Sequence, residues 1–192
     1  MDLTQAVSEA SNTKCAPDGT IARVGLTEDS VLVLYVGALV DGTGYDLVYY
    51  EFWGETKGPG NTPGILMDPV RIEVAQADTS GRPLPASWTT VFYWGDGQVD
   101  SNTSLPDKYT IDGEIANDPI LAVDLYAGAD LNENDAIDTE DGSGIAIDIG
   151  QNNGVPWPFV RITSPLAGTV DTGEAAEVDA IEALIATNGI SD

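Results

Sequence analysis

The stretch "DLVYYEFW" at residues 46–53 decides the fold class, because β-branched and aromatic side chains fill most of it. Successive side chains of a strand point to opposite faces, so Val48, Tyr50 and Phe52 fall on one face and Trp53 falls on the other. Residues of these types are enriched in strands. We therefore predict a strand here.

Short apolar runs of the same kind recur between turns. "SVLVLYV" (30–36) is apolar on both faces, and "VRIEVAQ" (70–76) places Val70, Ile72 and Val74 on an inward face. Further strand candidates are residues 89–94, 120–126, 144–150 and 159–163. The 21 glycines and 11 prolines separate these runs. We expect an all-β fold, an antiparallel β-sandwich of the jelly-roll type, as a single domain.

One segment has a different pattern. In residues 174–187, Val178 and Ile181 stand at helical spacing among alanines and glutamates, which favour helix. Propensity alone therefore predicts a helix near the end of the chain. The glycine- and proline-rich residues 54–64 are expected to form a loop between two strands.

The charge balance narrows the classes of partner. The chain has 32 Asp and Glu against 7 Lys and Arg, a formal charge of -25. Such a chain repels nucleic-acid phosphates and anionic membrane surfaces and attracts cations, so we expect no nucleic-acid partner. It contains no histidine, which rules out Ser-His-Asp machinery and His-ligated zinc. No run of 18 apolar residues occurs, so no membrane insertion is expected.

The N-terminal region carries the single cysteine. We divide the chain into an N-terminal extension, residues 1–14, and a β-sandwich domain, residues 15–192. Cys15 cannot form an internal disulfide and is expected to be chemically idle. "MDLTQAVSEA" lacks the basic and apolar regions of a signal peptide, which leaves open a cytosolic protein or a chain that begins after processing.

The order of the segments resembles a known group of proteins. "CAPDGTIARVGLTEDSVLVLY", "LVDGTGYDLVYYE", "VRIEVAQ", "WTTVFYWGDGQVDSNTS", "GIAIDIG", "PFVRITSP" and "AEVDAIEAL" follow one another in the chain. Together they resemble bacterial cell-surface jelly-roll domains related to the discoidin or galactose-binding-like fold, over roughly residues 15–185. The resemblance implies a strand at 177–184 in place of the helix. It also implies a surface module that binds glycans, proteins or calcium through loops.

An acidic stretch outside this resemblance, "DLNENDAIDTED" at residues 130–141, has the spacing of a calcium loop. EF-hand loops supply oxygen atoms at positions 1, 3, 5, 7, 9 and 12, the seventh from a backbone carbonyl. Those positions are Asp130, Asn132, Asn134, Ala136, Asp138 and Asp141. Asp135 replaces the glycine expected at position 6, and an aspartate replaces the glutamate at position 12. An exposed acidic turn is the other interpretation. We predict a bound calcium ion.

Two further acidic groups and three tryptophans are candidate sites. A second metal site could use Asp41 and Asp46, or Asp96, Asp100 and Asn102. Trp157, Trp53 and Trp94 could stack on sugar rings if they are exposed, although tryptophans more often pack in the interior.

These observations favour a non-catalytic, extracellular, calcium-binding module for adhesion, surface assembly or glycan binding. A structural subunit of an appendage or virion shell, with self-assembly through edge strands, is the alternative. A carboxylate-dependent glycoside hydrolase or lyase needs no histidine, but the sequence pairs no two carboxylates for it, so we expect no enzyme. Crosslinks from Lys14, Lys57 or Lys108 to Asn or Asp are not expected.

Overall fold

The computed structural model describes part of the chain, and these ranges are residues 22–24, 31–51, 64–109, 119–126, 144–150, 154–164 and 176–184. Within them the regular elements are strands and three short 3-10 helices, and every strand pair is antiparallel. The 3-10 helices are η2 (Pro85–Ser87), η3 (Asp107–Tyr109) and η4 (Ala122–Asp124). The all-β prediction is confirmed for the described residues.

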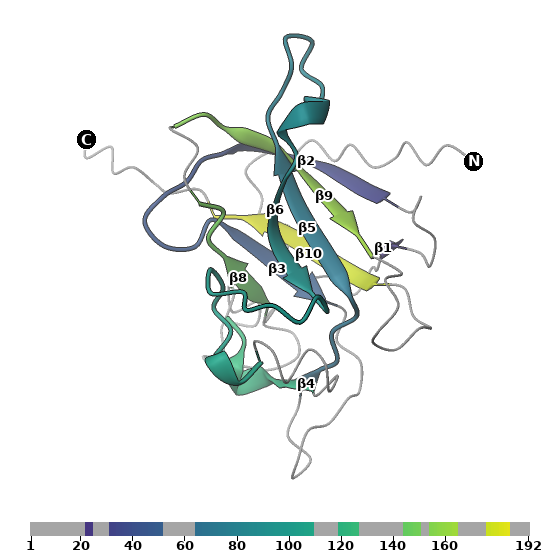
Figure 1. Ribbon diagram of the computed structural model, residues 1–192, viewed down its shortest axis with the longest axis vertical. Coiled ribbons are helices and arrows are strands. Elements are labelled where there is room, and N and C mark those ends of the chain that lie inside the picture. Colours follow the sequence, from purple (N-terminus) through teal and green to yellow (C-terminus); the bar gives the residue numbers. More distant parts are fainter. Residues whose placement is uncertain are drawn as a thin grey trace, which may run out of the picture.

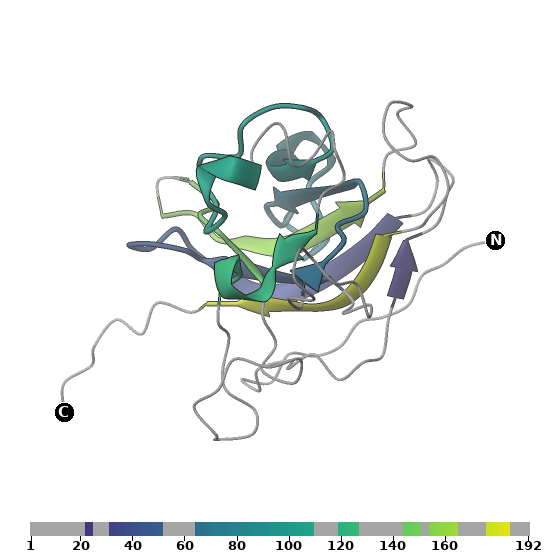
Figure 2. The ribbon, with the colours of Figure 1, turned by 90° about the horizontal axis from the view of Figure 1, so that it is seen from below.

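Two four-stranded sheets lie one above the other (Figures 1 and 2). Sheet A has the order β1 (Ala22–Val24), β10 (Ala176–Ala183), β3 (Leu47–Glu51) and β8 (Ile145–Ile147). Sheet B has the order β2 (Val31–Leu39), β9 (Trp157–Thr163), β5 (Val70–Ala75) and β6 (Thr89–Trp94). A small third sheet joins β4 (Gly64–Ile65) to β7 (Ile120–Leu121).

The main core is built from the facing sides of the two sheets. Val70, Ile72 and Val74 of β5 are completely buried, as the alternation in "VRIEVAQ" predicts. Leu47 and Tyr49 of β3 belong to the same cluster and come from the other sheet. Each fully buried aliphatic side chain stabilises the fold by about 1.5–3 kcal/mol, so this shared cluster holds the two layers together.

The outer side of β3 is buried as well. Val48 and Tyr50 form a second apolar cluster with Ala146 of β8 and Ala180 of β10. The Tyr50 hydroxyl donates a hydrogen bond to Glu182 Oε2 at 2.8 Å. Both faces of β3 are therefore covered, which explains why its sequence is apolar at nearly every position.

The helix predicted from propensity near the end of the chain is wrong, and β10 occupies that place. The pairing of β10 with β3 shifts register between Val178 and Ala180. Because of this bulge, Val178 and Ile181 both join the main core although they are three positions apart. The spacing that suggested a helix therefore belongs to a bulged strand, and the strand implied by the family resemblance is confirmed.

The strand predicted at residues 120–126 is largely wrong. Ile120–Leu121 form a two-residue strand, the chain then turns into η4, and Tyr126 makes an isolated bridge to Gly144. The carboxylate of Asp124 accepts hydrogen bonds from Lys108 Nζ at 2.6 Å and from the Tyr109 hydroxyl at 2.7 Å. These contacts tie η4 to η3 and account for the end of the strand.

Gly144 is needed where β8 packs on β3. A Cβ atom at this position would stand 2.6 Å from the backbone oxygen of Tyr49 and 2.8 Å from side-chain atoms of Val48 and Tyr50. A carbonyl oxygen inside a sheet cannot move away as a flexible side chain can. The absence of a side chain at position 144 therefore permits the β3–β8 pairing.

We expect Gly144→Ala to lower the free energy of unfolding by about 1–3 kcal/mol, because the added methyl group overpacks the sheet. Urea unfolding followed by tryptophan fluorescence measures the change. Val123→Ala, at a side chain that is 73% exposed, is the control and should stay within about 0.5 kcal/mol of the parent. Equal stability of Gly144→Ala and the parent would contradict the packing described here.

Candidate metal centre

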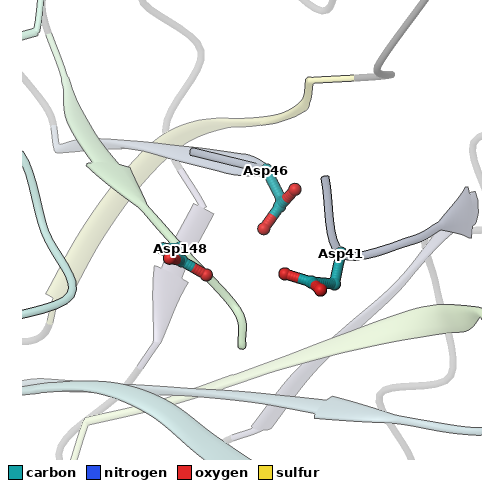
Figure 3. A group of neighbouring side chains, drawn as sticks. All are labelled: Asp41, Asp46 and Asp148. Carbon is teal, nitrogen blue, oxygen red and sulfur yellow. The ribbon is translucent and has the colours of Figure 1, made fainter. Parts of the chain in front are cut away.

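Three aspartate side chains meet at one end of sheet A. Asp41 lies just after β2, Asp46 directly precedes β3, and Asp148 directly follows β8. Figure 3 shows their carboxylates turned toward a common space, and one oxygen from each lies within 4.8 Å of the other two. The antiparallel pairing of β3 with β8 places the start of one strand beside the end of the other.

Asp46 is held in place through its backbone and its side chain. Its amide donates to the carbonyl of Ile147 at 2.9 Å, which extends the β3–β8 ladder by one bond. Its carboxylate accepts hydrogen bonds from the amide of Gly42 at 2.8 Å and from the amide of Ile149 at 3.2 Å. The side chain therefore closes the turn before β3 and fixes the chain after β8.

Asn102 fixes the position of Asp148. The Asp148 amide donates to the Asn102 carbonyl at 2.8 Å, and Asn102 Nδ2 donates back to the Asp148 carbonyl at 2.8 Å. The same Nδ2 also donates to the carbonyl of Val91 in β6, at 2.8 Å. This amide side chain thus joins Asp148 to β6, and its nitrogen is used for structure.

The three carboxylates form a site of concentrated negative charge. Burial raises the pKa of Asp46, its two backbone hydrogen bonds oppose that rise, and the nearby charges of Asp148 and Asp41 add to it. Asp46 is only 2% exposed. None of the ion pairs formed by the described residues includes any of the three aspartates. A cation among them would favour the ionised state of all three.

The spacing of the carboxylates suits one hard divalent cation. Calcium binds oxygen ligands at 2.3–2.6 Å, so two ligands on opposite sides of the ion are about 5 Å apart. A separation of at most 4.8 Å among the three oxygens is compatible with a single ion between them. Calcium takes six to eight ligands, so water and backbone carbonyls would complete the shell. Zinc would favour histidine and cysteine, and the chain has no histidine and one cysteine.

Asp41 and Asp46 were predicted as metal ligands from the sequence, whereas Asp148 was not. All three stand at the ends of apolar strands, where a charged side chain leaves the core. Asp148 lies inside "GIAIDIG", which was assigned as strand, so its place at the edge was hidden. Glu51, another acidic residue of β3, lies at the opposite end of the strand from Asp46. It is buried and accepts a hydrogen bond from the Tyr49 hydroxyl.

The predicted calcium loop at residues 130–141 lies outside the described residues. The described part ends on either side of it at Tyr126 and Gly144, whose backbones exchange two hydrogen bonds of 2.8 Å and 3.0 Å. The Tyr126 ring packs edge-on against Tyr45, with ring centroids 6.1 Å apart, and Tyr45 is the neighbour of Asp46 in the chain. The two residues that flank the loop segment are therefore held together, and Tyr126 contacts the turn that carries Asp46.

The other acidic candidates have roles within their own loop. Asp96 accepts a hydrogen bond from the amide of Gln98 at 2.7 Å, as turn aspartates commonly do. Burial raises the pKa of Asp100 to about 6, against a backbone hydrogen bond from Tyr93 that lowers it. The charge of Asp96 adds to the rise. Asp100 Oδ2 is buried and has no hydrogen-bond partner within the described part of the chain.

Two of the three candidate tryptophans are buried, and the third lies outside the described residues. Trp94 is 2% exposed and Trp157 is 7% exposed, and both belong to the main core. Neither forms an exposed stacking platform. Trp157 begins β9, opposite Leu39. Trp53 is the residue that is not described.

Comparison with known proteins found no relative. No family model, no curated protein and no solved structure matches the chain. Among the described residues, no helix has the length and apolar character needed to cross a membrane.

Asp100 should make the protein less stable as the pH rises from about 4 to about 6. Burial raises the pKa of its carboxyl from the ordinary value of 3.8 to about 6, so in this window the folded chain holds a proton that the unfolded chain has lost. Stability is fully present below the unfolded pKa and is lost as the pH passes the folded pKa. Solvent access to this half-buried group limits the loss to about 1–2 kcal/mol.

Urea unfolding at several pH values measures this loss, and Asp100→Asn is the comparison. The variant has no titrating group at position 100, so the loss assigned to Asp100 should disappear from its pH profile. Asp96→Asn removes a nearby exposed charge and should leave most of the loss in place. Identical profiles for the parent and Asp100→Asn would show that position 100 is not the source.

Proposed function

We propose that this chain is a non-catalytic β-sandwich module of the jelly-roll type that binds calcium and acts outside the cell or at its surface. The observation that carries the proposal is the convergence of Asp41, Asp46 and Asp148 on one space at the end of sheet A. The formal charge of -25 supports a cation as the ligand, and the absence of histidine favours an oxygen-seeking ion.

Bound calcium would join two segments of the chain that are far apart in the sequence. Asp41 and Asp46 flank the turn between β2 and β3, and Asp148 follows β8. An ion that ligates all three connects the β2–β3 turn to the chain after β8. It also neutralises charge next to a buried carboxylate. Calcium sites in extracellular modules have dissociation constants on the order of 10⁻⁴ to 10⁻³ M, which suits an exterior rich in calcium.

We keep the loop at residues 130–141 as a second calcium site within this proposal. Its ligands would be Asp130, Asn132, Asn134, Asp138, Asp141 and the carbonyl of Ala136. The contact between Tyr126 and Tyr45 supports a link between the two sites, because it connects the residue before the loop segment to the turn that carries Asp46. Adhesion, surface assembly or glycan binding would be the role of such a module, and a glycan would have to use residues other than the buried Trp94 and Trp157.

Calcium should raise the thermal unfolding midpoint of the parent protein above its value in EDTA. Binding at a free concentration one hundred times the dissociation constant stabilises the folded state by about 2.7 kcal/mol. For a domain of this size that corresponds to a rise of about 5–10 °C. Asp148→Asn should lose most of the rise that the cluster supplies, because it removes a charged ligand while keeping the size of the side chain.

Two further variants separate the sites. Asp78→Asn removes one exposed charge from a turn that involves none of these ligands, so it should respond to calcium as the parent does. Asp130→Ala combined with Asp141→Ala tests the loop. If calcium still raises the unfolding midpoint of Asp148→Asn but no longer raises that of the loop variant, the ion binds in the loop. A rise reproduced by sodium chloride at equal ionic strength, or no rise at all, would refute calcium binding.

A further inference from the structure

Strand β2 lies at the open end of sheet B. It pairs with β9 on one side, over Val31 to Leu39, and within the described residues no strand pairs with its other side. None of the backbone hydrogen bonds made outside the strand ladders by the described residues involves β2. Its nine residues make it the longest strand that the structure describes. An edge of this kind presents backbone donors and acceptors to any strand that approaches.

The outward face of β2 is apolar. Leu32, Leu34 and Val36 face inward and pack against the main core. The alternate side chains, Val31, Val33 and Tyr35, are 38%, 39% and 48% exposed. The Tyr35 ring also packs edge-on against Phe159 of β9, with centroids 5.5 Å apart. The edge therefore offers a row of large apolar side chains together with its free backbone groups.

Residues 31–35 of this edge lack the features that usually keep strands from associating. Natural edge strands carry lysine, proline, inward-pointing charges or bulges that prevent pairing with another molecule. Residues 31–40, "VLVLYVGALV", contain no charged residue and no proline. The irregularity that β2 does have lies toward its end, where the register shifts between Tyr35 and Leu39 and Gly37 has a φ of 81°. Residues 31–35 form a regular, uncharged edge.

The charge around β2 distinguishes this edge from the rest of an acidic protein. Val33 is paired with Arg161 of β9, and Arg161 donates two hydrogen bonds of 2.7 Å to Glu73 of β5. Arg71, also of β5, lies 3.7 Å from the same carboxylate. The ion-pair group beside β2 thus holds two guanidinium groups for one carboxylate. Each copy of the chain has a formal charge of -25. The electrostatic repulsion between two copies is therefore smallest when they meet through a surface where guanidinium groups outnumber carboxylates.

We propose that β2 pairs antiparallel with β2 of a second copy of this chain and joins two sheets B into one. In the register that we propose, Val33 faces Val33 of the second copy, and Val31 faces Tyr35 of the second copy. This two-fold register pairs all three outward side chains and stops before the bulge. Aromatic and β-branched pairs across strands are favourable, and no carboxylate within the paired stretch faces another.

Self-pairing explains the sequence of this edge better than a foreign strand does. A two-fold pair requires the same stretch to serve both sides, and "VLVLY" supplies apolar side chains at every position of both. The net charge of each copy opposes association, so the dimer should be weak and should strengthen as salt screens the repulsion. A surface ion-pair interface would show the opposite dependence on salt.

Sedimentation velocity over a range of protein concentrations and salt concentrations tests the proposal. For the parent, the mass should rise from the monomer value of 20.1 kDa toward twice that value, with tighter association at higher salt. Val33→Lys should weaken association at least tenfold, because it places two lysines face to face across the two-fold axis. Val123→Lys makes the same substitution at a side chain that is 73% exposed, away from β2, and should associate as the parent does.

Disulfide trapping tests the register and does not depend on the stability of Val33→Lys. Val33→Cys in a Cys15→Ser background should form a covalent dimer under mild oxidation, well ahead of Val99→Cys in the same background. Val99 is 52% exposed and lies outside the β2 edge. A parent that stays monomeric at all concentrations and salts would overturn the proposal. Equal trapping at positions 33 and 99, or a dimer unaffected by Val33→Lys, would also overturn it.

Discussion

The carboxylate of Asp46 is the group on which the arrangement of sheet A and of the candidate metal centre depends. It is 2% exposed, yet it accepts backbone hydrogen bonds from Gly42 and Ile149. Leaving those amides without an acceptor would cost about 1–3 kcal/mol each, so the side chain must stay where it is. That requirement aligns the turn before β3 with the chain after β8, and it sets the position of two further aspartates around one buried negative charge. The same contacts that complete the sheet therefore bring together three carboxylates that could hold a cation.

The excess of acidic residues also accounts for the difference between the end of sheet A and the edge of sheet B. With 32 acidic and 7 basic residues, most of the exterior repels any other acidic molecule. Carboxylates gather at the end of sheet A, whereas the edge of sheet B is uncharged and lies next to Arg161. Proposed cation binding and proposed self-pairing are thus two responses to one imbalance, the first neutralising charge and the second avoiding it.

The fold class could be predicted from the alternation of apolar side chains, and each error has an identifiable physical cause. Val70, Ile72 and Val74 identified their strand correctly because period-two burial is visible in the sequence. Val178 and Ile181 suggested a helix because a β-bulge changes the spacing of the buried side chains in this strand, and no residue in that stretch predicts the bulge. Of the cluster, Asp41 and Asp46 could be selected as acids near a turn. Asp148 could not, because its neighbourhood is set by β3–β8 pairing and by Asn102, which are contacts between distant segments.

Terbium luminescence tests the central claim, calcium binding by the aspartate cluster, most directly. Terbium replaces calcium at oxygen sites and emits when a nearby aromatic ring is excited, and Tyr45 adjoins Asp46 in the chain. In buffered salt that suppresses loose association with the acidic surface, the parent should show saturable emission that calcium reverses. Asp148→Asn should lose most of that emission, and Asp78→Asn should keep it. Emission that is unchanged in Asp148→Asn, or that calcium does not displace, would contradict a calcium site at Asp41, Asp46 and Asp148.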